Sequence, residues 1–148
     1  MKKELLGIVA VVSMLLPNLD AFGQEMAVVD VSKIVSNYSK AQDVSMDLKV
    51  KEAELKTMVA EAEKSIKSAN VSEQKGLEEK YKNVLAEKQA LYRQQYEQQL
   101  QSVETDIEDA IKTVSQSKNI KIVLNKNSVV YGGDDLTEEV LKALNVKK

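Results

Sequence analysis

The fold is decided by residues 40–117, which read KAQDVSMDLKVKEAELKTMVAEAEKSIKSAN over 40–70 and VSEQKGLEEKYKNVLAEKQALYRQQYEQQLQSVETDIEDAIKTVSQS over 71–117. This stretch contains no proline and one glycine, Gly76. In its first part, apolar residues recur at steps of three, four or seven, a spacing that predicts one long amphipathic α-helix. They are Ala41, Val44, Leu48, Leu55, Met58, Ala62, Ile66 and Ala69.

The second part repeats the pattern after a short break at residues 69–72. Its apolar stripe contains Leu77, Tyr81, Val84, Leu85, Leu91, Tyr92, Tyr96, Leu100, Val103, Ile107, Ala110, Ile111 and Val114. Because the connection is short, the two helices are expected to run antiparallel. Helices of about 30 and about 45 residues would extend roughly 45 and 65 Å. Either the longer helix overhangs, or a further helical piece before Lys40 extends the shorter one.

The segments that flank this hairpin contain short strand patterns. Residues 26–31 are rich in β-branched side chains and predict a buried strand, followed by a short helix over 32–38. Residues 119–125 alternate as a strand does, and residues 128–131 predict its antiparallel partner across a tight turn. A closing helix is expected after Asp135.

The sequence therefore predicts an α+β fold that is mostly α. A long antiparallel helical hairpin, residues 40–117, forms a coiled-coil arm. Residues 24–39 and 118–148 form a small β-rich head. Such a head has no disulfide and few large apolar side chains, and its strand edges need partners, so we expect the chain to self-associate through it.

Residues 1–23 are predicted to be a signal peptide. Two lysines precede an apolar run at residues 5–16, and the small residues Ala21 and Gly23 suit cleavage before Gln24. About 12 apolar residues fall short of the roughly 20 that a bilayer span needs, so the alternative, a permanent membrane anchor, is disfavoured. We expect an exported mature chain with no stable membrane anchor.

Composition argues against several classes of function. With no cysteine and no histidine, the chain lacks thiolates, the usual general base and the commonest transition-metal ligand. Its 21 basic and 23 acidic residues give a net charge of −2, without the basic excess typical of nucleic-acid binding. Carboxylates and lysines recur at surface spacings such as Glu52/Lys56 and Glu63/Lys67. We expect no enzymatic activity, cofactor, metal or nucleic-acid partner.

The flanks of the hairpin contain IVLNKNSVVY at residues 122–131, DLT at 135–137, VLKALN at 140–145 and AVVD at 27–30. With these motifs, both flanks resemble the Skp/OmpH family of periplasmic chaperones. Together with the charged hairpin, the resemblance covers the mature chain. The family implies a homotrimer in the periplasm of a Gram-negative bacterium. Its heads would share a small β-barrel, and its arms would enclose a cavity for unfolded outer-membrane β-barrel proteins.

The resemblance thus implies an ATP-independent holding chaperone, in keeping with the lack of a glycine-rich phosphate loop. The residues we predict to face clients, at the tip or the inner face of the arm, are Met58, Ile66, Val71, Leu77 and Tyr81. The residues we predict for the core of the trimeric head are Val28, Val29, Ile122, Leu124, Val129 and Tyr131. An alternative function is that of a structural coiled-coil adaptor of the cell envelope.

The sequence departs from the family in one respect. Better-known members carry a basic cluster on the second arm helix that is associated with lipopolysaccharide. The corresponding residues 94–101 are rich in glutamine, and only Arg93 nearby is basic. The sequence therefore argues against lipopolysaccharide binding. Because the arm is also mildly acidic, we expect clients to be held mainly by apolar contact.

Overall fold

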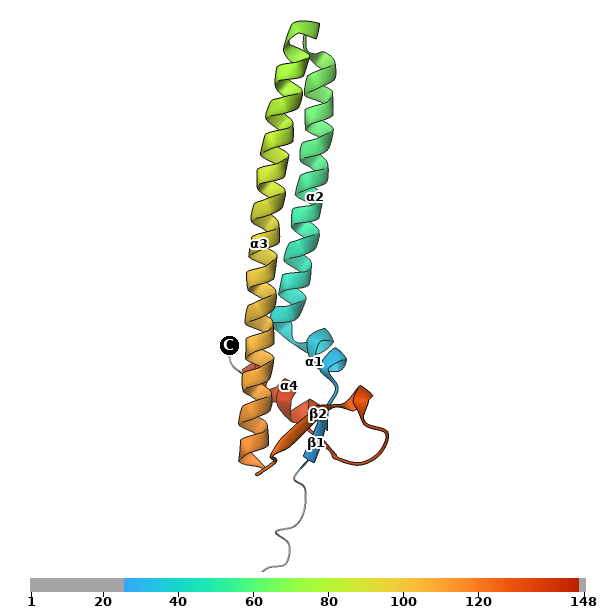
Figure 1. The fold of residues 1–148 in the computed structure, drawn as a ribbon, viewed down its shortest axis with the longest axis vertical. Coiled ribbons are helices and arrows are strands. Elements are labelled where there is room, and N and C mark those ends of the chain that lie inside the picture. Colours follow the sequence, from blue (N-terminus) through green and yellow to red (C-terminus); the bar gives the residue numbers. More distant parts are fainter. Residues whose placement is uncertain (1–25, 147–148) are drawn as a thin grey trace, which may run out of the picture.

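A computed structural model describes residues 26–146. Its elements are β1 (Met26–Val29), α1 (Val31–Asn37), α2 (Ser39–Ser68), α3 (Val71–Ser117), β2 (Ile122–Asn125), the 3₁₀ turn η3 (Lys126–Ser128), β3 (Asp134–Asp135) and α4 (Thr137–Val146). The α2–α3 hairpin stands on a small head that contains the strands, α1 and α4 (Figure 1). The predicted fold class, mostly α with a small β head, is confirmed. The predicted signal peptide, residues 1–23, lies outside the described residues.

The two long helices have the predicted lengths. α2 contains 30 residues and α3 contains 47. Between them, Ala69 and Asn70 have extended backbone conformations, and α3 begins at Val71. α3 continues past the start of α2 alongside the head, and α1 precedes α2 with only Tyr38 between them (Figure 1). The longer helix therefore overhangs, and a further helical piece also precedes the shorter one.

The core fills the head and reaches into the lower arm. Ile34 of α1, Leu136 just before α4, and Val140 within α4 are fully buried. α3 adds buried side chains at steps of four, three and four, which lie on one face of the helix. These are Val103, Ile107, Ala110 and Val114. The overhang of α3 is thus part of the core of the head.

The head contains a parallel three-stranded sheet in the order β2-β1-β3. Along β1, Met26 is opposite Ile122 of β2, and Val28 is opposite Asp135 of β3. Ala27 and Val29 belong to the main core cluster, and Val28 between them is buried as well. Successive strand residues point to opposite faces, so β1 is covered on both sides. The predicted buried strand is confirmed.

The predicted antiparallel hairpin of strands over residues 119–131 is wrong. β2 pairs in parallel with β1, and residues 128–131 form no strand. After β2, the Asn125 side chain accepts a hydrogen bond of 3.1 Å from the backbone N–H of Asn127, which closes a 3₁₀ turn. The chain then passes through Gly132 and Gly133, both at φ 90°, and pairs on the other edge of β1. Local turn chemistry does not reveal this long-range pairing.

Gly133 is required by close packing as well as by its backbone angle. Its φ of 90° lies in a region that residues with a Cβ atom rarely adopt. A Cβ atom built at this position would lie 3.2 Å from Cγ1 of Val28. The glycine therefore allows the chain to pass directly over β1 and place β3 against it.

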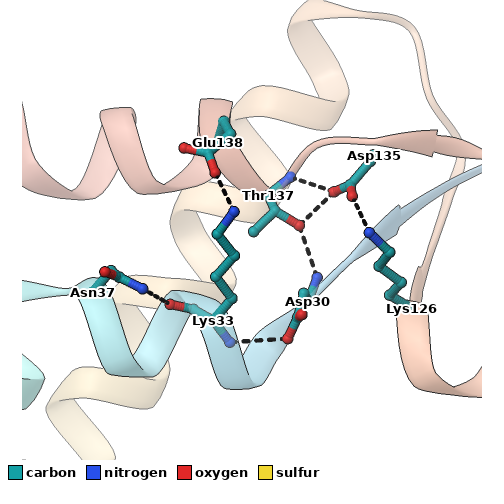
Figure 2. A network of polar contacts seen from close by, with 7 residues as sticks. All are labelled: Asp30, Lys33, Asn37, Lys126, Asp135, Thr137 and Glu138. Carbon is teal, nitrogen blue, oxygen red and sulfur yellow. Dashed lines mark hydrogen bonds and ion pairs between the residues drawn. The ribbon is translucent and has the colours of Figure 1, made fainter.

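A polar network joins the C-terminal segment to the end of β1 (Figure 2). The backbone N–H of Asp30 donates to Oγ1 of Thr137 at 2.9 Å. The backbone N–H and the hydroxyl of Thr137 both donate to the Asp135 carboxylate, and Nζ of Lys126 donates to the same carboxylate at 2.7 Å. These donors, Lys126 first, lower the pKa of Asp135 to about 2.

Candidate functional site

An apolar groove opens on one flank of the arm near its tip. It has a volume of about 450 Å³, and we call it the tip groove. It is lined by Val59, Ala62, Glu63, Ile66, Glu78, Tyr81, Lys82, Leu85, Ala86 and Gln89. The apolar side chains come from both helices, and Val59 is 42% exposed to solvent. Glu63, Glu78 and Lys82 also line the groove. The rest of its surface is mostly apolar and can contact apolar groups of a ligand.

A second hollow of about 510 Å³ lies further down the arm, and we call it the mid-arm hollow. It is lined by Val50, Ala53, Glu54, Thr57, Met58 and Lys88. Thr57 of this hollow and Val59 of the tip groove are two residues apart, which is roughly 200° around an α-helix. The two hollows therefore open on opposite flanks of the hairpin.

Between the helices, the middle of the arm is polar. Nζ of Lys51 donates to Oε1 of Gln95 at 2.8 Å and pairs with the Asp47 carboxylate at 2.7 Å. Gln99 also donates to Asp47, and the ammonium group of Lys51 lies 5.4 Å from the centre of the Tyr92 ring. The hydrogen bond from Lys51 is the main reason that the pKa of Asp47 is lowered. The glutamine-rich run thus supplies hydrogen-bond partners across the seam where apolar packing is interrupted.

The structure separates the five residues that we predict to face clients. Ile66 and Tyr81 come together in the tip groove, whereas Met58 lines the mid-arm hollow on the opposite flank. Val71 is the first residue of α3 and is 86% exposed. Leu77 is half-buried and does not line the tip groove. Their contact with clients remains a prediction.

Sequence reasoning missed Val50 and Val59, which are exposed apolar residues in the two hollows. Both lie outside the apolar stripe that seals the hairpin. Their position off the stripe could have identified them from the sequence, because a large apolar residue outside the stripe of an amphipathic helix does not pack into the seam.

The residues predicted for the head core divide into two groups. Val28 and Val29 are buried within the single chain, and Val129 is half-buried. The remaining three are exposed: Ile122 to 48%, Leu124 to 42% and Tyr131 to 97%. β2 and the loop after it therefore present an uncovered apolar surface in the single chain. That this surface forms the core of a trimer remains a prediction.

Within residues 26–146, no group of three or more acidic residues is placed to hold a metal ion. Over the same residues, no helix combines the length and the apolar character that crossing a membrane requires.

By its fold, the chain belongs to the class of proteins in which a long helical hairpin stands on a small sheet, here a parallel one. A family model described as "Outer membrane protein (OmpH-like)" matches residues 25–144. The chain therefore belongs to the OmpH-like family, and the predicted resemblance is confirmed.

No curated protein matches the sequence. Among solved structures, the chain is similar to an OmpH-like protein from Caulobacter crescentus CB15 that is described as a candidate outer membrane chaperone. The identity is 14%, the TM-score is 0.46, and the match covers 84% of this chain and 86% of that one.

Proposed function

We propose that the protein is an ATP-independent holding chaperone of the periplasm. It binds unfolded outer-membrane β-barrel proteins in a cavity between the arms of a homotrimer and prevents their aggregation. Membership of the OmpH-like family supports this proposal. The observation that carries it is the apolar surface left open on both flanks of the arm, in the tip groove and the mid-arm hollow.

The form of this surface suits an unfolded client. Single exposed apolar residues are ordinary, but here they line two hollows along one extended arm. A strand of an outer-membrane barrel carries an apolar residue at every second position, so an unfolded barrel offers many small apolar groups and no fixed shape. Shallow contacts spread along the arm can hold such a chain without requiring one tight pocket.

The head supports assembly into an oligomer. β2 is an edge strand, and Ile122 and Leu124 along it are exposed in the single chain, as is Tyr131 in the following loop. Exposed edges and apolar patches of this kind are normally covered by another chain. A mass measurement of the native protein near three chains supports the cavity, whereas a stable monomer at working concentration removes it.

Light scattering tests the holding activity. A urea-unfolded outer-membrane β-barrel protein is diluted into buffer with the purified mature protein at about one trimer per client. We expect the client to stay soluble without ATP. Unchanged aggregation at several-fold excess of the protein contradicts the proposal. Recovery of one folded envelope protein in fixed ratio, with no denatured clients, favours the adaptor function instead.

A matched pair of variants locates the activity on the arm. Val59→Ser with Ile66→Ser makes the tip groove polar, and we expect it to weaken client holding several-fold. Ala60→Ser with Ala90→Ser places the same hydroxyl groups at exposed helix positions outside both hollows and is expected to act as wild type. Circular dichroism verifies that both variants keep their helices. Equal holding by the two variants places client contact elsewhere.

A further inference from the structure

The arm meets the head at an elbow between two helices. α1 ends at Asn37, α2 begins at Ser39, and only Tyr38 separates them, with an extended backbone at φ −82° and ψ 119°. The N–H of Tyr38 bonds back into α1, and its carbonyl oxygen accepts from the N–H of Gln42 in α2 at 3.1 Å, so one residue serves both helices. The chain changes direction there (Figure 1). We call residues 37–40 the elbow.

A carboxylate of α3 holds the elbow. The hydroxyl of Tyr38 donates to Oδ2 of Asp106 at 2.8 Å, and Nζ of Lys40 donates to the same oxygen at 2.5 Å. Nζ of Lys40 also donates to Oγ of Ser102, about one turn away along α3, at 2.7 Å. Asp106 and Ser102 therefore bind the foot of α2 to one short stretch of α3.

An amide of α4 holds the elbow as well. The backbone N–H of Ser39 donates to Oδ1 of Asn145 at 3.3 Å, and Nδ2 of Asn145 donates to the backbone carbonyl oxygen of Asn37 at 3.3 Å. These two backbone groups lie at the end of α1 and at the start of α2, where helices lack internal partners. A single side chain therefore fixes both helix ends relative to each other and to α4.

The two helices of the arm enter the head in different ways. α3 runs from the arm into the core of the head as one continuous helix, whereas α2 stops at the elbow. A hairpin that is attached through one helix alone is free to tilt, and attachment of the second helix removes this freedom. The arm therefore keeps a fixed direction only if the foot of α2 keeps a fixed position on the head.

Apolar packing alone does not fix that position. Tyr38 and Val44 belong to the core cluster, so the foot of α2 is buried against the head. Hydrophobic burial is non-directional and permits small sliding movements, whereas hydrogen bonds depend on both distance and angle. The side chains of Lys40 and Asp106 are 41% and 38% exposed, so their ion pair contributes little to stability. Its main effect is on geometry.

The length of the arm amplifies any movement at the elbow. Asp106 lies about 35 residues from Val71 at the tip, which is about 50 Å along α3. A tilt of about 10° at the elbow therefore moves the tip by about 9 Å. In an oligomer of parallel arms, a movement of that size changes the width of the space between the tips.

We infer that Asp106 and Asn145 are positioning residues of the arm. They fix the direction of the arm relative to the head, and with it the width of the cavity in which a client is held. This role rests on the proposed holding function, but the contacts that perform it lie within one chain. Without these two side chains the head stays folded, and the arm tilts over a wider range.

Single-molecule fluorescence energy transfer between two dyes on one chain tests the inference. The chain has no cysteine, so Ser72→Cys at the exposed start of α3 and Ser128→Cys at an exposed position after β2 give two attachment sites. Labelled copies are diluted with unlabelled protein, so that transfer occurs within one chain in any assembly. We expect one narrow distribution of tip-to-head distances in the protein with an intact elbow.

A matched pair of variants locates the effect at the elbow. Asp106→Ala with Asn145→Ala removes both attachments, and we expect the distance distribution to become at least twice as wide while circular dichroism is unchanged. Glu139→Ala with Gln116→Ala also removes one carboxylate and one amide from the head, but away from the elbow. The Glu139 carboxylate pairs with Lys118 at 2.6 Å, and these side chains are exposed to a similar degree, 44% and 41%. This control should keep the narrow distribution.

A milder variant covers the case in which the elbow variant does not fold. Tyr38→Phe keeps the buried ring and removes only the hydroxyl group that donates to Asp106, so its distribution should widen by a smaller amount. An unchanged distribution in every elbow variant that folds overturns the inference. Equal widening in the control also overturns it, because the loss of any polar contact in the head then suffices.

The same experiment separates the role of the elbow from the proposed function. A wild-type protein that keeps no client soluble contradicts the holding proposal, whereas the widths of the distance distributions still decide the role of Asp106 and Asn145. Conversely, a protein that holds clients and whose tip-to-head distances ignore the elbow variants keeps its proposed function and loses the inferred positioning residues.

Discussion

α3 passes through two different environments along its length. Its lower part, from Val103 to Val114, contributes four buried side chains to the core of the head. Its upper part, residues 71–102, contains no buried residue. The same helix thus anchors the fold at one end and offers half-covered apolar surface at the other.

The difference arises from the number of neighbours. The lower part of α3 packs against α4, β2 and the start of α2, as Figure 1 shows. The upper part packs against α2 alone, and one helix can cover only one side of another. This chain therefore places most of its buried apolar contacts in the head and leaves apolar surface of the arm free to contact other molecules.

The largest effect expected from this comparison is on the core of the head. Leu136→Ala removes a fully buried side chain and should lower the free energy of unfolding by about 2–5 kcal/mol. Ile66→Ala, in the half-covered tip groove, should lower it by less than about 1 kcal/mol, because only part of its area leaves a protein environment. Urea unfolding followed by circular dichroism measures both. Similar losses for the two variants would mean that the tip groove contributes as much to stability as the core of the head does.

A smaller effect is expected from the polar network of Figure 2. Thr137→Val keeps the shape of a buried side chain but removes the acceptor for the backbone N–H of Asp30. We expect a loss of about 1–3 kcal/mol in the free energy of unfolding, since that donor is then left without its partner. Thr137→Ser, which keeps the hydroxyl group, is the matched control. If Ser and Val at this position are equally destabilising, the network contributes little.

Acid should weaken the head through Asp135. The pKa of Asp135 in the folded state is about 2, below its ordinary value, mainly because Lys126 donates to it. Because the pKa of Asp135 is lower in the folded state than in the unfolded state, its carboxylate stabilises the fold at pH values above the unfolded pKa. This stabilisation is lost as pH falls from about 4 towards 2. Since the group is partly exposed, we expect the loss to be no more than about 1 kcal/mol. Unfolding curves at pH 5 and pH 2.5 should lie closer together for Asp135→Asn than for wild type.

The smallest effect is expected in the polar middle of the arm. Lys51→Met replaces a half-buried ammonium group with an apolar side chain of similar length, and the free energy of unfolding should change by less than about 1 kcal/mol. The pKa of Asp47 should rise when this partner is lost, which carbon-detected nuclear magnetic resonance can follow. A large loss of stability would mean that the polar layer, and not the head, holds the hairpin together.

The hairpin could be predicted from sequence because its signals are local and repeated. The stripe from Ala41 to Ala69, the break, and the second stripe fix two helices whose lengths the structure confirms. The sheet could not be predicted in the same way. Residues 128–131 have the composition of a strand, yet β1 takes its second neighbour from Asp134 and Asp135, two residues with low strand propensity. Pairing between distant segments leaves little trace in either one alone.

The candidate site was predicted only in part for a related reason. The apolar period identified Ile66 and Tyr81 correctly as residues of neighbouring helices, and the structure brings them into one groove. Which flank a residue faces depends on how the two helices are rotated about the seam. The apolar period alone therefore groups Met58 with Ile66 and Tyr81, although Met58 lines the mid-arm hollow on the opposite flank.

The strand order β2-β1-β3 has a consequence for how the polypeptide acquires its structure. The central strand comes from the first described residues, whereas both of its neighbours come from beyond residue 121. A ribosome makes the central strand first, so that strand has no pairing partner until nearly the whole chain has been synthesised. Contacts of such wide sequence separation form slowly unless something shortens the search. Early pairing of α2 with α3 would do so, because an antiparallel hairpin brings the segment that forms β2 and β3 back beside β1.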